Sequence, residues 1–565
     1  MNRHIRTAIV GMIAGAIASA VLVLSLGHPR SGILLGVLVG TVFAAGMQHT
    51  QQAYVDMVMA GGSLGIPLWG LVSVVTLPML SGQKPEWSAE QMRAQLPALV
   101  GWVLFGVLLG LLTPALSALA DKIFGPQARG TSPLPGAKKR IVILGGGFAG
   151  MKTAECLEQE LRTNASAAIT LVSETNALLF TPMLAEVAGS TLEPSHISTP
   201  LRSSLRRTEF IRGRVNSIDL ANRKVILAGL ASDSPGERLE IPFDHLVLAL
   251  GSVSNYLGMA NVEKLAFNFK SLLDAIRIRN HAIEMFERAD RETDVSIRRS
   301  LLTFVIAGGG FAGVELAGAL NDFARGILAD YPNLDQNDLN IVLVHSRDRI
   351  LPELSESLAK YAQEKMAARG VKFRLNARLA DAKPGLVLLS DGEIPAQTLV
   401  WTAGTAPNPL LKSLPFETDK RGAVKVDSTL AVVGRPDVWA LGDCAAVSDG
   451  KTGKPCPPTA QFAIREAATV ARNIAGQLRG RPLKPFHFDS LGALCVVGHQ
   501  TACAELSVPF ARTKSVRFSG LLAWLMWRGI YLSKLPGMER KIRVLMDWTI
   551  ELFFPRDIVQ TIDLR

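Results

Sequence analysis

The hexapeptide Gly-Gly-Gly-Phe-Ala-Gly occurs twice in this sequence, at residues 145–150 and 308–313. Each copy follows a short apolar run, Ile141–Leu144 in the first case and Phe304–Ala307 in the second, and each precedes a helical stretch. A buried strand, a glycine-rich turn and a helix, in this order, form the phosphate-binding start of a Rossmann fold. The two copies therefore predict two dinucleotide-binding units in one chain, with hydride transfer between the dinucleotides as the reason to have both.

The glycines of each copy have separate tasks. Gly145 makes the tight turn, Gly147 lets the backbone approach the pyrophosphate, and Gly150 lets the helix pack closely on the strand. Phe148 and Ala149 open the helix whose N-terminus binds the phosphates. The glycines with these tasks in the second copy are Gly308, Gly310 and Gly313.

A side chain at the end of the second strand of such a unit binds the adenosine ribose. In the first unit this place is Ser173, with Glu174 beside it as a candidate ribose ligand. In the second unit the strand ends in His345, followed by Ser346 and Arg347. The missing acid and the nearby arginine favour, or at least permit, the 2′-phosphate of NADPH.

A third motif indicates which dinucleotide binds where. The apolar strand that ends in Gly442-Asp443 resembles the second FAD fingerprint of flavoproteins with two dinucleotide-binding domains, in which the aspartate binds the ribityl chain. Residues 246–251 and 401–404 resemble the two crossings between those domains. The crossing residues that the resemblance assigns to the cofactor sites are Gly251, Ala403 and Gly404. It implies FAD in the first unit and NAD(P)H in the second.

The first 125 residues contain only ten charged residues. The uncharged gaps between these are long enough to cross a hydrocarbon layer of ~30 Å. We expect four transmembrane helices, over residues 8–27, 32–48, 62–80 and 97–120. A cleaved signal peptide is the alternative for the first of them, but the apolar run continues beyond the small residues Ala18–Ala20.

Basic residues near these helices predict the orientation. With both ends of the block in the cytoplasm, seven basic residues lie inside and three outside, which the positive-inside rule favours. The seven are Arg3, Arg6, Lys122, Arg129, Lys138, Lys139 and Arg140, and the three are Arg30, Lys84 and Arg93. The prediction is a multi-pass protein of the cell (inner) membrane with its catalytic domain on the cytoplasmic side.

The chain after Ser519 combines apolar and aromatic residues with basic ones. This combination is typical of a helix that lies in the membrane interface. The basic residues expected to meet lipid headgroups are Arg528, Lys534, Arg540, Lys541 and Arg543. A helical hairpin packed on the protein itself is the alternative.

The five cysteines include no pair closer than eight residues. They therefore lack the Cys-x4-Cys spacing of flavoprotein disulfide reductases, and no metal or iron–sulfur spacing is present. We expect no metal site, no nucleic-acid partner and direct transfer of electrons from the reduced flavin to an acceptor.

From about Lys139 to its end the chain resembles the type II NADH dehydrogenases, single-chain FAD enzymes that pass electrons from NADH to membrane quinone without pumping protons. The sequence segments on which this resemblance rests are ILGGGFAG, LLFTPMLAEVAG, LVLALGS, AGGGFAGVELAG, VWTAG, ALGDCA, PPTAQFA and the tryptophan-rich tail. The resemblance implies that Glu315 lies near the nicotinamide and that Ala460 and Gln461 form the quinone motif. Arg465 stands where that motif often has a second glutamine.

The predicted fold class is α/β, with two Rossmann-like domains, the NAD(P) domain being inserted in the FAD domain. Its expected parts are transmembrane helices over 1–125, a linker over 126–138, FAD-binding segments over 139–268 and 403–509, an NAD(P) domain over 269–402 and helices over 510–565. The predicted function is transfer of hydride from NAD(P)H to FAD and of two electrons to membrane quinone, with a homodimer as a possibility. The alternatives are an NADPH-dependent reductase with a protein acceptor and a membrane transporter or sensor with a redox-reporting flavin domain.

Overall fold

In the computed structural model the chain divides into two compact units, of which the first consists almost wholly of residues Met1–Arg129. The structure describes residues 3–26, 29–47, 54–80, 82, 93–124, 139–162, 167–228, 239–507 and 515–560. The predicted linker over residues 126–138 lies outside these ranges.

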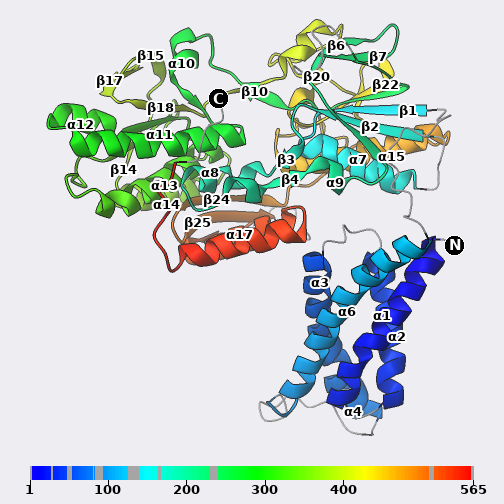
Figure 1. Cartoon of the computed structure of the whole chain (residues 1–565). Coiled ribbons are helices and arrows are strands. Elements are labelled where there is room, and N and C mark those ends of the chain that lie inside the picture. Colours follow the sequence, from blue (N-terminus) through cyan, green and yellow to red (C-terminus); the bar gives the residue numbers. More distant parts are fainter. Residues whose placement is uncertain are drawn as a thin grey trace. The chain divides into compact units, whose positions relative to one another are not determined.

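The first unit is a bundle of long apolar helices (Figure 1). Its elements are α1 (Arg3–Leu26), α2 (Pro29–Met47), α3 (Tyr54–Leu68), the π-helix η1 (Trp69–Thr76), α4 (Leu77–Leu80) and α6 (Leu96–Phe124). Three helical spans are long and apolar enough to cross a membrane, namely Arg6–Leu24, Met57–Met79 and Leu96–Ala120. The apolar part of α2, Gly32–Ala45, is shorter than the predicted span.

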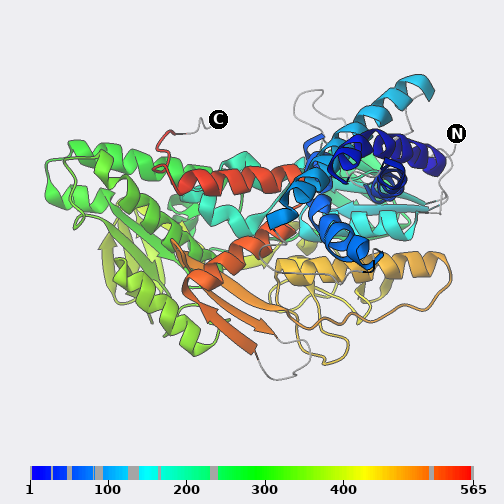
Figure 2. The same cartoon turned by 90° about the horizontal axis from the view of Figure 1, so that it is seen from below.

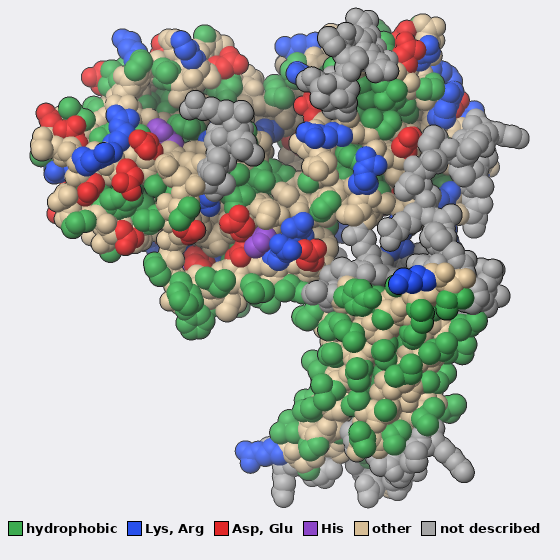
Figure 3. Space-filling model, viewed as in Figure 1, with side chains coloured by type: hydrophobic (Ala, Val, Ile, Leu, Met, Phe, Trp, Pro, Cys, Tyr) green, Lys and Arg blue, Asp and Glu red, His purple; other side chains and the backbone are tan. Residues whose placement is uncertain are grey.

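Glycines bring the helices of this unit into backbone contact. A Cβ atom added to Gly15 of α1 would lie 2.1 Å from the carbonyl oxygen of Gly36 in α2, and one added to Gly61 of α3 would lie 2.0 Å from that of Gly106 in α6. Larger side chains do not fit there, as in the small-residue interfaces of membrane helices. Hydrophobic side chains cover the visible sides of the bundle (Figure 3).

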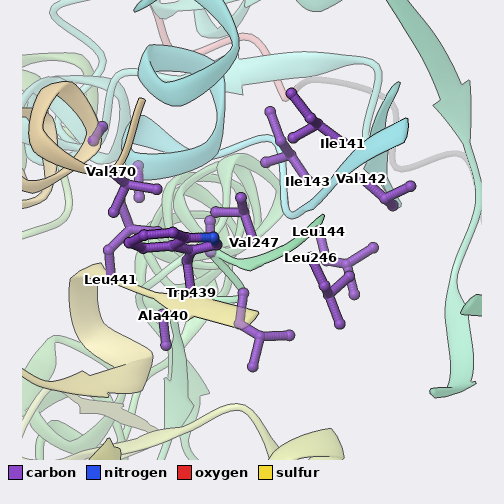
Figure 4. Close-up of a cluster of buried hydrophobic side chains, with 14 of the residues drawn as sticks. Ile141, Val142, Ile143, Leu144, Leu246, Val247, Trp439, Ala440, Leu441 and Val470 are labelled. Carbon is purple, nitrogen blue, oxygen red and sulfur yellow. The ribbon is translucent and has the colours of Figure 1, made fainter. Parts of the chain in front are cut away.

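A six-stranded sheet forms the core of the first Rossmann domain, in the order β21-β22-β9-β1-β2-β5. Its strands are β1 (Lys139–Leu144), β2 (Ala167–Ser173), β5 (Thr208–Arg212), β9 (His245–Leu248), β21 (Ala431–Val432) and β22 (Arg435–Ala440), all parallel to their neighbours except β21. The helices α7 (Phe148–Glu160) and α15 (Ala460–Leu478) pack together beside it. Apolar side chains of β1, β9, β22 and α15 make the buried cluster of Figure 4.

A second sheet repeats this design, with five parallel strands in the order β11-β18-β12-β13-β14. The strands are β11 (Phe267–Asn268), β12 (Thr303–Ala307), β13 (Asn340–Val344), β14 (Val371–Arg374) and β18 (Thr398–Trp401). Its longer helices are α11 (Leu272–Arg291), α13 (Phe311–Ile327) and α14 (Glu356–Ala368). The short strands β10 (Ser252–Ser254) and β19 (Thr405–Pro407) pair with each other where the chain leaves and re-enters the first domain.

Each Rossmann domain also has a three-stranded antiparallel sheet, which precedes β9 in the first domain and β18 in the second. These are β6 (Val215–Asp219), β7 (Lys224–Leu227) and β8 (Leu239–Pro242) in the first domain, and β15 (Leu379–Lys383), β16 (Leu386–Leu389) and β17 (Gly392–Pro395) in the second. Shorter elements that enter the account below are α8 (Leu184–Ala188), α10 (Ala260–Leu265) and the 3-10 turn η6 (Gly442–Cys444).

The chain ends in a three-stranded sheet and two helices (Figure 2). These are β24 (Gly492–Gly498), β25 (Thr501–Ser507), β26 (Ser515–Ser519), α16 (Gly520–Lys534) and α17 (Met538–Glu551). In Figure 2 the sheet (orange) lies between the green inserted domain and the domain that contains α15. Its first strand therefore adjoins both nucleotide-binding domains.

The tail helices have a packed side and an exposed side. Trp524, Trp527 and Trp548 are buried against the protein. Apolar residues that remain exposed are Leu521, Leu522, Leu525, Leu545, Met546, Ile550, Leu552, Phe553 and Phe554. The prediction that Arg528 meets lipid headgroups is wrong, because its guanidinium lies 2.8 Å from the Glu551 carboxylate and over the Trp524 ring. Its side chain is only 12% exposed.

Candidate functional site

The first glycine turn has the shape that a dinucleotide pyrophosphate requires. A Cβ atom on Gly145 would lie 2.2 Å from the carbonyl oxygen of Ala249, and one on Gly150 would lie 1.8 Å from that of Gly145. At Gly147 the same atom would meet nothing within 4 Å. Two glycines are thus required by close packing, while the third leaves open space at the N-terminus of α7, where Phe148 begins the helix.

The second turn repeats this geometry. A Cβ atom on Gly308 would lie 2.5 Å from the hydroxyl of Thr402, and one on Gly313 would lie 1.8 Å from the carbonyl oxygen of Gly308. At Gly310 the nearest group is the carboxylate of Glu353, at 3.8 Å. Both turns therefore fit a dinucleotide phosphate at the N-terminus of the following helix.

The two strand-end residues occupy equivalent places behind these turns. A Cβ atom on Gly146 would lie 2.6 Å from Ser173 Oγ, and one on Gly309 would lie 2.6 Å from His345 Cγ. Glu174, the predicted ribose ligand, is exposed, and its carboxylate lies 3.7 Å from Arg214 Nε. The structure thus brings both strand ends to the glycine turns.

The imidazole of His345 is tied to the second turn. The backbone N–H of Gly309 donates to His345 Nδ1 at 3.1 Å, which leaves the ring proton of the neutral form on Nε2. Burial, followed by the charge of Arg347, lowers the pKa of His345. Its Nε2 atom is buried without a partner among the described residues, and the Arg347 side chain is exposed. A neutral hydrogen-bond donor therefore stands where an acid would exclude a 2′-phosphate.

The Gly442-Asp443 motif forms the turn η6 after β22. Gly442 has a φ of +69°, which favours glycine, and its N–H donates to the buried carboxylate of Glu466 at 2.7 Å. Burial raises the pKa of Glu466 to about 7. Asp443 accepts a hydrogen bond of 2.6 Å from Ser252, the residue after Gly251.

The crossing glycines differ in their surroundings. Gly251 has a φ of +65°, and a Cβ atom there would meet nothing within 4 Å. A Cβ atom on Gly404 would lie 2.8 Å from the carbonyl oxygen of Asn255, which reflects the close pairing of β10 with β19. Ala403 is exposed beside it.

Glu315 lies on α13, five residues after Gly310 of the second glycine turn. Its carboxylate is buried and accepts a hydrogen bond of 3.3 Å from the N–H of Val496 in β24. Burial raises the pKa of Glu315 to about 8. The Glu315 side chain therefore connects the second nucleotide-binding domain with the C-terminal sheet. Its carboxyl group is protonated near neutral pH.

The predicted quinone motif contacts the same C-terminal sheet. Ala460 begins α15, and the Gln461 side-chain amide donates to the carbonyl oxygen of Gly492 at 3.1 Å. The Gln461 carbonyl accepts the N–H of Leu491 at 3.3 Å. Arg465 is exposed, with its guanidinium carbon 5.3 Å from the centre of the Phe488 ring.

A small cavity lies between α8, α13, β24 and the tail helices. Its charged lining residues are Glu186, Glu315, Asp322, Arg528, Glu551 and Arg556. Burial raises the pKa of Glu186 to about 7, against the opposing effect of the nearby Arg528. Sequence reasoning missed Glu186, although a single acid inside the apolar run 183–188 is a signal for a buried partner.

Three further residues near the FAD motif were missed. Glu466 lies on the buried face of α15 with Ala463 and Val470, and its helical spacing from them could have identified it. Ser252 and Lys270 are in contact, although 18 residues separate them and no motif joins them. Only the folded chain reveals that contact.

The sequence profile of the family described as "Pyridine nucleotide-disulphide oxidoreductase" matches residues 139–467, and that of the "NDH2 C-terminal domain" matches residues 491–557. A "Probable NADH dehydrogenase" of Dictyostelium discoideum is 33% identical over 453 residues, which cover 78% of this chain and 95% of that protein. A "Type II NADH:quinone oxidoreductase" of Mycobacterium tuberculosis is 30% identical over 447 residues, or 76% of this chain and 91% of that protein.

Among solved structures, NDH2 from Plasmodium falciparum in complex with NADH has a TM-score of 0.67 at 18% identity and covers 75% of this chain and 100% of its own. This likeness confirms the predicted α/β flavoprotein fold with Rossmann-like domains. With the two family profiles and the relatives above, it also confirms FAD as the cofactor and NADH as a substrate. The chain belongs to the type II NADH:quinone oxidoreductases within the pyridine nucleotide-disulphide oxidoreductase family.

Proposed function

We propose that this protein is a membrane-bound enzyme that takes hydride from NADH or NADPH and passes two electrons, by way of FAD, to a quinone dissolved in the membrane. The proposal rests on the two glycine turns, which leave space for a phosphate at Gly147 and Gly310. It also rests on Glu315 and Gln461, which bind the C-terminal sheet next to these domains. When bound, FAD supplies the two-electron chemistry, so the protein needs no nucleophile of its own.

The residues of the chain then bind and orient the reactants. Gly147 and Gly310 admit the two pyrophosphates, while Asp443 binds the ribityl chain and is held in place by Ser252. Glu315, protonated near pH 7 because burial raises its pKa to about 8, lies beside the nicotinamide. These assignments of Asp443 and Glu315 extend the family's roles to this chain.

The acceptor side is proposed at the start of α15. Ala460 and Gln461 would contact the quinone, with Arg465 as a cationic donor in place of the family's second glutamine. In the structure the amide of Gln461 already binds Gly492 and Leu491. Quinone binding by Gln461 therefore requires that this side chain exchange one internal hydrogen bond for one to the quinone carbonyl.

Two parts of the chain support attachment to a membrane. The first unit has three spans with the length and apolar character to cross a bilayer, and we propose that α2 crosses as a fourth. The exposed apolar residues of α16 and α17 would rest in the interface. The basic residues near the helices of the first unit, seven inside against three outside, support a flavin domain on the cytoplasmic side of the cell membrane. Homodimer formation stays a prediction.

We propose that NADPH is accepted beside NADH. The strand-end donor His345 Nε2 has no partner among the described residues, and Arg347 is exposed next to it. A 2′-phosphate offers acceptors to the exposed Arg347 and would also accept from His345 once Nε2 is uncovered, whereas an acid at this place would repel it.

The function is tested with the purified protein in vesicles that contain quinone. NADH oxidation should require quinone in the vesicle membrane and should stop when the quinone is fully reduced. Equal rates with and without quinone would contradict the proposal, because oxygen would then be the acceptor. Replacement of Gln461 by Ala should raise the KM for quinone and leave the rate of flavin reduction by NADH unchanged.

A further inference from the structure

Lys270 is a partly buried cation between the two nucleotide-binding domains. Its ammonium group donates a hydrogen bond of 2.6 Å to Ser252 Oγ, and Ser252 donates one of 2.6 Å to the carboxylate of Asp443. Lys270 follows β11 of the second sheet, whereas Asp443 follows β22 of the first. The chain Lys270–Ser252–Asp443 therefore bridges the two domains at the crossing strand β10.

The position of Lys270 is restrained by contacts of its main chain and by the strand that holds its hydrogen-bond partner Ser252. The main-chain N–H of Lys270 donates to Asp274 at 3.0 Å, as part of the capped start of α11. Ser252 belongs to β10, where it pairs with Pro407 of β19. The position of the charge is thus fixed by the backbone of two domains.

This charge has little compensation within the described part of the protein. The ammonium makes one hydrogen bond, to a neutral hydroxyl, and forms no ion pair there. Burial lowers the pKa of Lys270, and Asp443 is the charge that opposes this effect. A cation taken out of water without a direct counter-ion is unfavourable, so its two remaining N–H groups need acceptors.

The position of Lys270 identifies those acceptors. Pyrophosphate binding is already provided by Gly147 and the N-terminus of α7. Lys270 lies instead next to the ribityl-binding Asp443, and the ribityl chain carries the isoalloxazine ring. It also lies beside β18, which leads to the second crossing at Ala403. If Asp443 binds the ribityl chain, the flavin ring that this chain carries would lie between the domains and would offer acceptors to the ammonium group.

We propose that Lys270 holds a positive charge against the flavin ring of FAD and favours its two-electron reduction. A ring that accepts a hydride gains negative charge, and a nearby cation stabilises the reduced form more than the oxidised one. Lys270 would therefore raise the midpoint potential of the bound flavin. This inference rests on the proposed path of hydride from NAD(P)H to FAD.

The test is the midpoint potential of the flavin in Lys270→Met, measured in the FAD-loaded protein by photoreduction with reference dyes. We expect Lys270→Met to retain FAD and to have a more negative flavin midpoint potential than the wild type. At a fixed potential, the ratio of reduced to oxidised flavin should fall about tenfold or more. Because neither NADH nor quinone enters this measurement, failure of this inference can be told apart from failure of the proposed function. Lys270→Arg keeps the charge and should keep the potential near that of the wild type.

The matched control is Lys264→Met, because Lys264 is an exposed lysine of the adjacent helix α10. It should leave the potential unchanged. If Lys270→Met lacks FAD or fails to fold, Ser252→Ala provides the second variant, since it keeps the charge of Lys270 and removes the hydroxyl that orients the ammonium. This hydroxyl also donates to Asp443, so the FAD content of the variant is measured together with its potential. Ser252→Ala should lower the potential by a smaller amount. An unchanged midpoint potential in Lys270→Met would overturn the inference. An equal decrease in the potential of Lys270→Arg and Lys270→Met would also overturn it.

Discussion

The residues behind the two glycine turns are the ones that we propose to distinguish the two dinucleotides. Ser173 and His345 occupy the same place in the two Rossmann domains, and both lie in contact with the turn itself. At the first turn, Ser173 and the Leu201 side chain together fill the space beside Gly146. At the second turn, the imidazole of His345 fills the space beside Gly309 and presents a neutral donor. We therefore propose that the side chain at each strand end influences which dinucleotide the turn accepts.

Replacement of His345 by Glu should shift the preference toward NADH. A carboxylate would accept from the ribose hydroxyls and repel a 2′-phosphate, so kcat/KM for NADPH should fall relative to that for NADH by about tenfold or more. Steady-state assays with both nucleotides measure the ratio. His345→Gln, which has similar size and no charge, separates repulsion from loss of the imidazole. A ratio that is the same in the Glu variant and the wild type would refute this role.

Glu466 gives a prediction on stability against pH. Its pKa is raised from 4.5 to about 7, so the folded protein keeps this carboxyl protonated while the unfolded chain ionises it. This group's contribution to the free energy of unfolding is therefore largest below pH 4.5 and declines as the pH rises to about 7. Glu466→Gln should remove this decline, with a gain of up to about 3 kcal/mol above pH 7.

Denaturant unfolding at pH 5 and pH 8 measures the effect. The exposed Glu364→Gln on α14 serves as the control and should change neither value. A Glu466→Gln protein that is less stable than the wild type at both pH values would show that the carboxylate is needed in its charged form at Gly442.

At the scale of helices and strands, local sequence patterns predicted most of the framework. Both strand–turn–helix units follow directly from the apolar runs and glycines, because the close contacts at Gly145 and Gly308 tolerate no other residue. The contacts that join distant segments could not be predicted. Lys270 meets Ser252, and Arg528 pairs with Glu551, only after the domains have packed. The tail pattern alone left open whether lipid or protein covers it, and the structure divides it between a packed and an exposed side.

The glycine contact between α1 and α2 gives a prediction for the first unit. Gly15→Leu should force these helices apart, because a Cβ atom there lies 2.1 Å from the Gly36 carbonyl oxygen. Overpacking of this kind costs about 1–3 kcal/mol. Thermal unfolding of the full chain in detergent, followed by circular dichroism at a helix wavelength, reports the loss. Gly70→Leu is the control, because a Cβ atom there meets nothing within 4 Å, and equal loss in both variants would contradict the account.

For the whole molecule, we propose that the first unit and the flavoprotein are separable in function. About three quarters of this chain aligns with 95% of the relative from Dictyostelium and with 91% of the relative from Mycobacterium. The cofactor-binding residues identified above all follow Lys139. We therefore propose that electron transfer depends on the second unit and that the first unit attaches the protein to the membrane.

Removal of residues 1–125 should leave the chemistry intact. With a water-soluble quinone analogue, kcat should stay within about twofold of the full chain, since independent parts contribute additively. With quinone confined to vesicles, the shortened protein should turn over more slowly because attachment is weaker. A shortened protein that folds and holds FAD but fails with the soluble analogue would place part of the acceptor site in the first unit.

The central claim is that hydride from a nucleotide in the second turn reaches FAD in the first and leaves to a quinone. Anaerobic rapid mixing tests it most directly, with flavin absorbance as the readout in two separate half-reactions. The account predicts that NADH bleaches the bound flavin and that addition of quinone, without any protein acceptor, restores its absorbance at a rate that supports turnover. A flavin that NADH and NADPH both leave oxidised, or that quinone leaves reduced, would contradict it.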